Sequence, residues 1–167
     1  MQLLEGIYSR RSVRHFTAEP VAREMLREII QAGTWAPSGL NNQPWRFVTI
    51  ASAPLRELLA DMTRYARIVR EAPALIAVFV DRAAMYNEVK DHQGAGACLQ
   101  NMLLAAHALG LGAVWLGEIL NNATAVREAL GLAEGLELMA VVAVGHPARR
   151  DQRSERLGVD AVLLREL

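Results

Sequence analysis

The chain has 167 residues, 52% of them hydrophobic and 22% charged, and its 18 Lys and Arg residues balance its 18 Asp and Glu residues. This length and composition predict one globular domain, 1–167, with a sizeable core. The even charge argues against a general nucleic-acid-binding surface, which needs a basic excess. The lone cysteine, Cys98, allows no intramolecular disulfide, and its apolar surroundings in the sequence predict an inert core thiol.

Neither a signal peptide nor a membrane span is expected. The N-terminus lacks a basic-then-apolar layout and carries Glu5 early. The most hydrophobic window, 102–120, is broken by Gly110 and Gly112, whereas a span needs about 20 predominantly apolar residues. We therefore expect a cytoplasmic protein that does not contact a membrane.

The first half of the chain mixes helical and extended patterns. In chain order we expect helices over residues 3–8 and 21–33, a loop over 36–44, a strand over 45–50 and a helix over 54–70. Apolar residues at helical spacing predict the second helix, which Gly33 can end. Two prolines, a glycine and two asparagines predict the loop, and Pro54 is tolerated in a first helical turn.

The second half predicts the centre of the fold. In chain order we expect a strand over residues 74–80, a polar irregular segment over 81–91 and a helix over 92–109. A strand over 113–116, a helix over 122–130 and a strand over 136–144 should follow. The continuous apolar run of the first strand is typical of a central position. Asp91 is expected to cap the long helix, which is apolar nearly all round, as in a helix buried by the core or by a second subunit. Because the domain is small, we expect a second subunit to bury part of this helix. The order of the elements predicts three layers, with a sheet of about four strands and an extended tail.

Five residues near the N-terminus, Arg10 to Arg14, form the first candidate site. Three guanidinium groups and the Ser12 hydroxyl lie within these five positions. A guanidinium presents a planar fork of donors that matches phosphate oxygens two at a time. Taken alone, such a run is more often a solvated basic turn.

Other loops hold groups that could surround a flat, phosphorylated cofactor such as a flavin. The polar or small residues that could meet the edge of a heteroaromatic ring are Ser38, Gly39, Asn41 and Gln43. The Gly117 amide could face a ring atom, and Arg153 or Arg156 could close over a phosphate. The sequence has no Gly-x-Ser-x-Gly elbow or phosphate-binding Gly-Lys-Ser/Thr loop, and its histidines lack the spacing of metal ligands.

Four motifs together resemble the nitroreductase family of FMN-dependent oxidoreductases. They are Arg10 to Phe16, Ala36 to Trp45, Ala108 to Gly112 with Trp115 and Gly117 behind it, and Gly145 to Pro147. They stand in the order and spacing of the family and span almost the whole chain.

The resemblance implies a three-layer α+β fold, with a central, mostly antiparallel sheet flanked by helices, in an intertwined homodimer that binds FMN at its interface. The implied contacts of the FMN phosphate and ribityl chain are Arg10, Arg11, Ser12, Arg14, Arg156 and, less firmly matched, Arg153. The loop that would reach the flavin of the other subunit holds Pro37, Ser38, Gly39, Asn41 and Gln43. The residues that would lie along the ring, with the Gly117 amide near flavin N5, are Trp115, Leu116, Gly117 and Glu118.

The implied activity is ping-pong hydride transfer from NAD(P)H through FMN to a small electron-poor acceptor, such as a nitroaromatic or a quinone. The flavin carries the chemistry, so no side chain need act as a general acid or base. The alternatives are an FMN protein of the same fold with another redox task (dehalogenation, flavin fragmentation or azoline oxidation), a flavin-binding protein without turnover, or a structural dimer that holds no flavin.

Three departures from the family pattern affect these expectations. The short segment 81–91 leaves the flavin face open, or covered by Met85, Tyr86 and the other subunit. The tail keeps Arg156 but not the first member of a Lys-x-Arg pair, so a role for Arg153 stays open. Leu40 replaces a residue that is often small or polar, and substrate preference therefore does not transfer.

Overall fold

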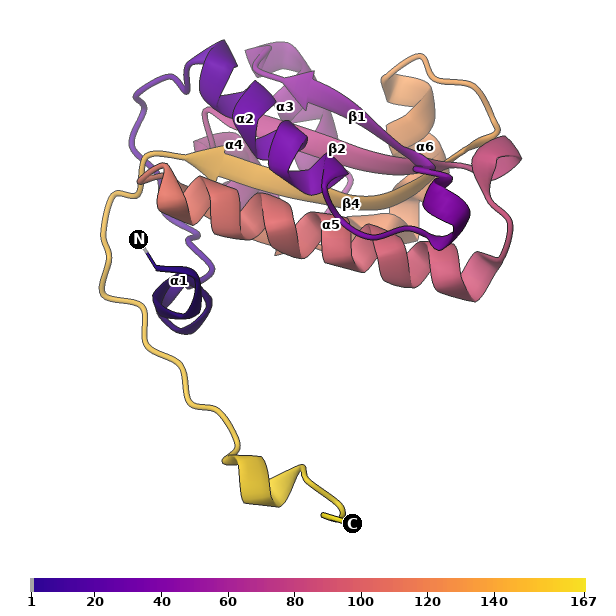
Figure 1. Cartoon of the computed structure of the whole chain (residues 1–167). Coiled ribbons are helices and arrows are strands. Elements are labelled where there is room, and N and C mark those ends of the chain that lie inside the picture. The colour runs from indigo at the N-terminus through magenta and orange to yellow at the C-terminus, as the bar shows by residue number, and fades with distance from the viewer. Residues whose placement is uncertain (1) are drawn as a thin grey trace.

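A single antiparallel sheet forms the middle layer of the protein. The computed structural model describes residues 2–167, and its strands β1 (Trp45–Ile50), β2 (Ala74–Asp81), β3 (Gly112–Leu116) and β4 (Leu136–Gly145) pair in the order β1-β2-β4-β3 (Figure 1). The segment 10–16 continues the sheet beyond β3, because Ser12 forms a parallel bridge to Ala113 and Phe16 an antiparallel bridge to Pro147. The predicted mostly antiparallel, four-stranded sheet is confirmed.

Helices cover both faces of this sheet, which confirms the three-layer prediction. One face carries α2 (Arg23–Thr34) and α5 (Glu88–Ala108). The other face carries α3 (Ala53–Ala60), α4 (Ala66–Glu71), η3 (Glu118–Asn122) and α6 (Ala123–Ala129). The helix α1 (Leu3–Ser9) contacts α5, and the remaining short 3-10 helices are η1 (Gly39–Asn41), η2 (Arg82–Ala84) and η4 (Val159–Ala161).

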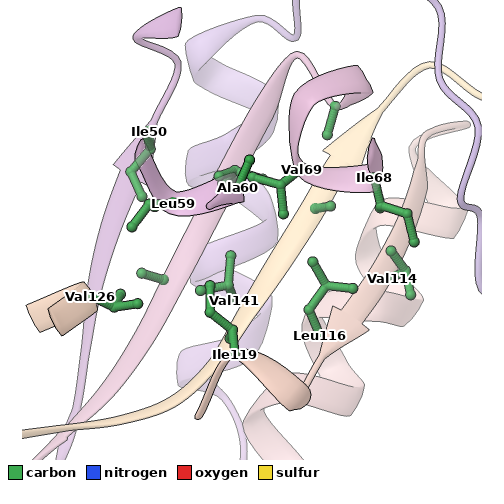
Figure 2. Packing of buried hydrophobic residues seen from close by; sticks show 14 of the residues in the cluster. Ile50, Leu59, Ala60, Ile68, Val69, Val114, Leu116, Ile119, Val126 and Val141 are labelled. Carbon is green, nitrogen blue, oxygen red and sulfur yellow. The ribbon is translucent and has the colours of Figure 1, made fainter. Parts of the chain in front are cut away.

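The central strand β2 is buried on both faces, as its apolar run predicted. Alternate side chains reach opposite layers: Phe79 packs with the α3 and α4 side, and Val78 with the α5 side. Figure 2 shows the first of these clusters, in which Leu59 and Val69 lie near Val141 of β4. Burying an aliphatic side chain of this size contributes about 1.5–3 kcal/mol, so these two layers stabilise the whole sheet.

Two helix predictions were wrong in their bounds. The predicted helix 54–70 is two helices, because residues 61–65 leave the helix and Thr63 donates a hydrogen bond to Glu118, which lies far along the chain. The helix predicted from residue 92 begins at Glu88, so the segment 81–91 is irregular only in its first part. Asn87 is the N-cap and accepts from the Lys90 amide at 3.0 Å, so Asp91 is not the cap.

The C-terminal tail leaves the domain in an extended conformation (Figure 1). Its apolar side chains, including Leu157, Val159 and Leu164, are exposed. Across residues 2–167, none of the helices is both long and apolar enough to cross a bilayer. Cys98 is fully buried, which confirms the prediction of a core thiol, and burial raises the pKa of this thiol to about 12.

Candidate functional site

The segment 10–14 lies extended along the edge of β3. The Val13 amide donates to the Ala113 carbonyl at 3.0 Å, and the Val13 side chain is buried against Gly112. Side chains of an extended segment alternate between its two faces. Arg10, Ser12 and Arg14 therefore share one face, whereas Arg11 lies with Val13 on the other and lines a cavity there.

The first of these faces carries positive charge without a counter-ion. Burial, together with the charges of Arg156 and Arg11, lowers the pKa of the Arg10 guanidinium. Its Nε atom is buried and has no hydrogen-bond partner among residues 2–167. Within the same described range, Arg10, Arg14 and Arg156 form no ion pair with a carboxylate. Unpaired guanidinium donors beside a free hydroxyl suit a phosphate group.

The tail contributes Arg156 to this basic cluster, which we define as Arg10, Ser12, Arg14 and Arg156. The charge of Arg156 acts on Arg10, and its Nη1 atom donates only to the neighbouring Glu155 carbonyl, at 2.8 Å. Arg153 is exposed, and the structure does not bring it to Arg10 in the same way.

Trp115 forms an aromatic surface on the α5 side of the sheet. It is 41% exposed, the one exposed position of β3. It shares its strand face with Ala113, and its Cη2 atom lies 4.0 Å from the position that a Cβ on Gly96 of α5 would take. The Leu116 side chain is buried in the opposite layer, so only the main chain of Leu116 can face a ring on the side of Trp115.

The carboxylate of Glu118 anchors the turn that follows β3. It accepts from Thr63 Oγ1 at 2.6 Å, from the Arg64 amide at 2.9 Å and from Arg64 Nε at 3.1 Å. The hydrogen bond from Thr63 and then the one from the Arg64 amide lower the pKa of Glu118. Its side chain therefore fixes the position of Gly117 instead of pointing at open space.

The loop 37–43 holds an unusual backbone. Leu40, Asn41 and Gln43 have φ angles of 53°, 55° and 46°, in the left-handed region that residues other than glycine rarely adopt. Such conformations cluster at functional sites, at a cost of about 1–3 kcal/mol each. Ser38 Oγ accepts from the Gln43 amide at 3.2 Å, and Gln43 Nε2 donates to the Asn41 carbonyl at 3.2 Å, so these polar groups shape the loop itself.

Gly39 makes room for Tyr86. A Cβ at Gly39 would lie 2.1 Å from the Tyr86 ring, so no other residue fits this contact unchanged. The small size of Gly39, which was expected to allow a close approach, therefore makes room within one chain for Tyr86, which lies just before α5.

A buried carboxylate that sequence reasoning missed ties the loop to α5. Asp91 is 1% exposed and accepts from Asn42 Nδ2 at 2.7 Å and from the amides of Tyr86 and Asn87 at 2.9 Å each. Burial opposes its ionisation, but these three hydrogen bonds outweigh burial and lower the pKa of Asp91. Asn42 Nδ2 also donates to the Ala84 carbonyl at 3.0 Å. In the sequence, an aspartate beside a long apolar run predicts a helix cap, whereas the structure shows a buried carboxylate that joins the loop to α5.

The two halves of the predicted site lie at opposite ends of α5 (Figure 1). The Pro37 carbonyl lies 3.4 Å from the position that a Cβ on Gly94, near the start of the helix, would take, whereas Ser9, just before the basic cluster, is hydrogen-bonded to His107 in its last turn. Asp91 and His107 are sixteen residues apart, which is about 24 Å along a helix. A single chain therefore does not bring the loop 37–43 to the basic cluster.

An apolar groove opens between α1, α2 and α5. It has a volume of about 440 Å³, and its lining includes Leu3, Trp35 and Leu104. Trp35 is 80% exposed. Large exposed apolar surfaces of this kind mark sites of interaction.

The Nitroreductase family profile matches residues 7–66 and 57–146. The crystal structure of a Desulfovibrio desulfuricans protein in complex with FMN has a TM-score of 0.94 and 54% identity, over 100% of this chain and 98% of its own.

Two curated relatives are similar over most of their length. The NADPH-flavin oxidoreductase of Vibrio harveyi is 31% identical over 172 residues, 96% of this chain and 72% of its own. The structure of the NADPH:FMN oxidoreductase of that organism, complexed with NAD+, has a TM-score of 0.89 at 29% identity, over 98% of this chain and 76% of its own. The 5,6-dimethylbenzimidazole synthase of Rhodospirillum rubrum is 32% identical over 181 residues, 89% of this chain and 84% of its own.

Proposed function

The chain belongs to the nitroreductase family, and from this premise we propose that it uses bound FMN to oxidise NAD(P)H and to reduce a small electron-poor acceptor of the nitroaromatic or quinone type. The relatives that are named oxidoreductases and the FMN complex of the Desulfovibrio protein support this assignment.

The observation that carries the proposal is the basic cluster without a counter-ion. The buried Arg10 Nε atom without a partner and the neighbouring Arg156 fit the phosphate of FMN, because charge-assisted hydrogen bonds to phosphate would satisfy both. Ser12 would add a hydroxyl donor, and Arg14 would complete the charge compensation. Arg11 would contribute main-chain contacts only, since its side chain lies on the other face.

We infer that the site is completed by a second copy of the chain. Asp91, which binds Asn42 of the loop 37–43, and His107, which binds Ser9 just before the basic cluster, are about 24 Å apart along α5. If two α5 helices pair in opposite directions, the loop of each copy comes close to the cluster of the other. The apolar groove beside α5 and the exposed apolar side chains of the tail offer surface for such a pair. A single FMN-binding domain, 1–167, in a homodimer is therefore our proposal for the assembly.

FMN, when bound, supplies the two-electron redox chemistry, accepting hydride from NAD(P)H and giving it to the acceptor in a ping-pong cycle. The residues of the chain bind the FMN and orient its ring. The Gly117 amide would donate to the ring and stabilise negative charge there, and the Glu118 carboxylate holds that turn in position. Trp115 would lie along the ring and exclude water. None of these groups needs to act as a general acid or base.

The loop 37–43 and the segment before α5 form one unit, which we propose also covers the flavin face of the other subunit. Tyr86 packs on Gly39, and Asn42 and Asp91 join the two segments. This arrangement supports a cover that includes Met85 and Tyr86 and comes from the other chain, in place of a longer helical excursion.

A second candidate function is another redox task of the same fold, such as dehalogenation, flavin fragmentation or azoline oxidation. It has support because the Rhodospirillum synthase is as similar to this chain as the Vibrio oxidoreductase is. A flavin-binding protein without turnover and a structural dimer that holds no flavin are the remaining alternatives.

Anaerobic mixing separates these candidates. Purified protein is expected to show the absorption of oxidised flavin, to bleach with NADH or NADPH, and to regain its colour when a nitroaromatic or quinone is added. Colourless protein that FMN does not reconstitute would refute the flavin assignment. Flavin that neither NADH nor NADPH bleaches would refute the reductase and leave the two alternatives that hold flavin.

The phosphate role is tested by Arg14→Ala. A hydrogen bond to a charged group contributes about 1.5–3 kcal/mol, so the dissociation constant of FMN should rise about 10- to 150-fold. Arg27→Ala, at an exposed position of α2, is the matched control. Unchanged FMN affinity in Arg14→Ala would indicate that residues 10–14 are a solvated basic turn.

The dimer is tested by Leu104→Glu, which places a charge in the groove beside α5. We expect light scattering to show monomers that no longer retain FMN, because burying an unpaired carboxylate is unfavourable. Leu58→Glu, on the exposed side of α3, should remain a dimer. A Leu104→Glu variant that stays dimeric and yellow would exclude this groove as the interface.

A further inference from the structure

A second, smaller cavity lies on the opposite face of the segment 10–14 from the basic cluster. Its volume is about 210 Å³, and its polar lining consists of Ser9, Arg11, His107, Arg150 and Gln152, over an apolar floor that includes Val13. Arg10 and Arg156 do not line it. Because side chains alternate along this segment, the cavity is separate from the face that carries Arg10, Ser12 and Arg14.

The lining brings positive charge together without a negative partner. Among residues 2–167, neither Arg11 nor Arg150 forms an ion pair with a carboxylate. Arg11 is held in place by donating from Nη1 to the carbonyls of Tyr8 and Arg10, at 2.6 and 2.9 Å. Its Nε atom is buried and has no partner within that described range. Arg150 is held by one hydrogen bond to the Gly110 carbonyl and keeps its other donors.

His107 responds to this excess charge. Its Nε2 atom is hydrogen-bonded to Ser9 Oγ at 2.8 Å. Burial first, and then the charges of Arg150, Arg10 and Arg11, lower the pKa of His107, while the charge of Glu5 acts in the opposite direction. An anion placed among these groups would remove much of the repulsion that disfavours the imidazolium form.

We propose that this cavity binds a small tetrahedral oxyanion of the phosphate class, at a site distinct from the phosphate end of the flavin site. The cavity is below the 300–1,000 Å³ of pockets for drug-sized ligands and far larger than the space that one water needs, so it suits one phosphate group with a few waters. Two guanidinium groups and the second N–H of the Gln152 amide, whose Nε2 also donates to the Arg149 carbonyl at 3.0 Å, offer donors from several directions, which match a tetrahedral anion better than a planar carboxylate.

The test uses the FMN-loaded protein in a phosphate-free chloride buffer, so that the flavin site is already filled. Inorganic phosphate is titrated while the His107 ring signals are followed by NMR. We expect a saturable shift of these signals, and a His107 pKa that rises when phosphate is bound. The flavin absorption should not change during the titration.

Two matched variants assign the effect to the cavity. Arg150→Gln should weaken phosphate binding by about tenfold or more, the effect of losing a charge-assisted hydrogen bond. Arg149→Gln changes the neighbouring exposed arginine, whose Nε atom is 3.7 Å from Asp151, and should bind as the unmodified chain does. Retained flavin absorption in both variants shows that they are folded.

A comparison of NADP+ with NAD+ identifies the source of the phosphate group. Because the two differ only by a phosphate, displacement of inorganic phosphate by NADP+ alone assigns the site to a nucleotide phosphate. Displacement by neither assigns it to the free ion, and both results support the proposal. Any of three results would overturn the proposal. The first is no saturable shift of the His107 signals. The second is equal phosphate binding in Arg150→Gln, which would mean an adventitious ion only, and the third is release of FMN as phosphate binds.

Discussion

Replacing Asp91 by alanine tests whether the loop 37–43 is held by the buried carboxylate. The substitution removes three hydrogen bonds, from Asn42 Nδ2 at 2.7 Å and from the amides of Tyr86 and Asn87 at 2.9 Å each. The two amides belong to residues just before α5 whose side chains are exposed but whose hydrogen bonds are partly buried, and Asn42 is half-buried. Its carboxamide would lose a charged hydrogen bond worth about 1.5–3 kcal/mol and remain poorly solvated, at a further cost of about 1–3 kcal/mol.

Relief from desolvating the carboxylate offsets part of this loss, so we expect the free energy of unfolding to fall by about 3 kcal/mol. For a chain of this size, 1 kcal/mol corresponds to roughly 2–4 °C in Tm, and thermal unfolding should therefore occur about 6–12 °C lower. Since Asn42 belongs to the loop, FMN should also bind more weakly.

Asp61→Ala is the matched control for this measurement. Asp61 accepts from Arg70 at 2.6 Å, but its side chain is 72% exposed, and exposed ion pairs contribute only about 0–1 kcal/mol. Both variants are compared by calorimetry and by urea unfolding. If Asp91→Ala costs no more than Asp61→Ala, the carboxylate does not hold the loop and the reasoning is refuted.

Gly112→Ala would place a Cβ 2.7 Å from the stiff, β-branched Val13, which must move the segment 10–14 away from β3. Fluorescence titration should then show weaker FMN binding than in Gly135→Ala, where the space is open, and equal affinities would contradict the contact. Because the pKa of Glu118 is lowered in the folded chain, its stabilisation is complete above the unfolded-state pKa and is lost as pH falls through the folded-state pKa. The Tm of Glu118→Gln should therefore depend less on pH in acid, and superimposable profiles would contradict this. Cys98 should not react with a thiol reagent at pH 8 until the protein unfolds, since its thiol is buried with a pKa of about 12; rapid labelling of the native protein would contradict its burial.

Strong local patterns predicted much of the fold. The apolar runs at 74–80 and 136–144 became paired strands of the sheet interior, and the alternation at 45–50 became an edge strand. The break at 61–65 was not predictable in this way, because residues there leave the helix to bind Glu118, which lies more than fifty positions away. Asn87, the actual cap of α5, lay within a segment too polar to show a helical period.

For the candidate site too, the sequence predicted the residues but not their arrangement in space. The sequence showed which residue types could bind a phosphorylated ring, and four motifs in a characteristic order indicated the nitroreductase family. It did not show that Arg10 and Arg11 face opposite ways, because that depends on the bridge from Ser12 to Ala113 of β3. Nor did it show that Asp91 is buried beneath Asn42.

The sequence by itself therefore determined the class of fold, the family and the chemical groups available to a flavin, because periodicity and motif order are properties of the chain. Only the tertiary structure decided which groups share a face, which carboxylates are buried, and that the two halves of the predicted site lie at opposite ends of α5. Those features depend on pairing between distant segments, and the burial and charge that shift the pKa values of Arg10, Asp91 and His107 exist only once these segments meet.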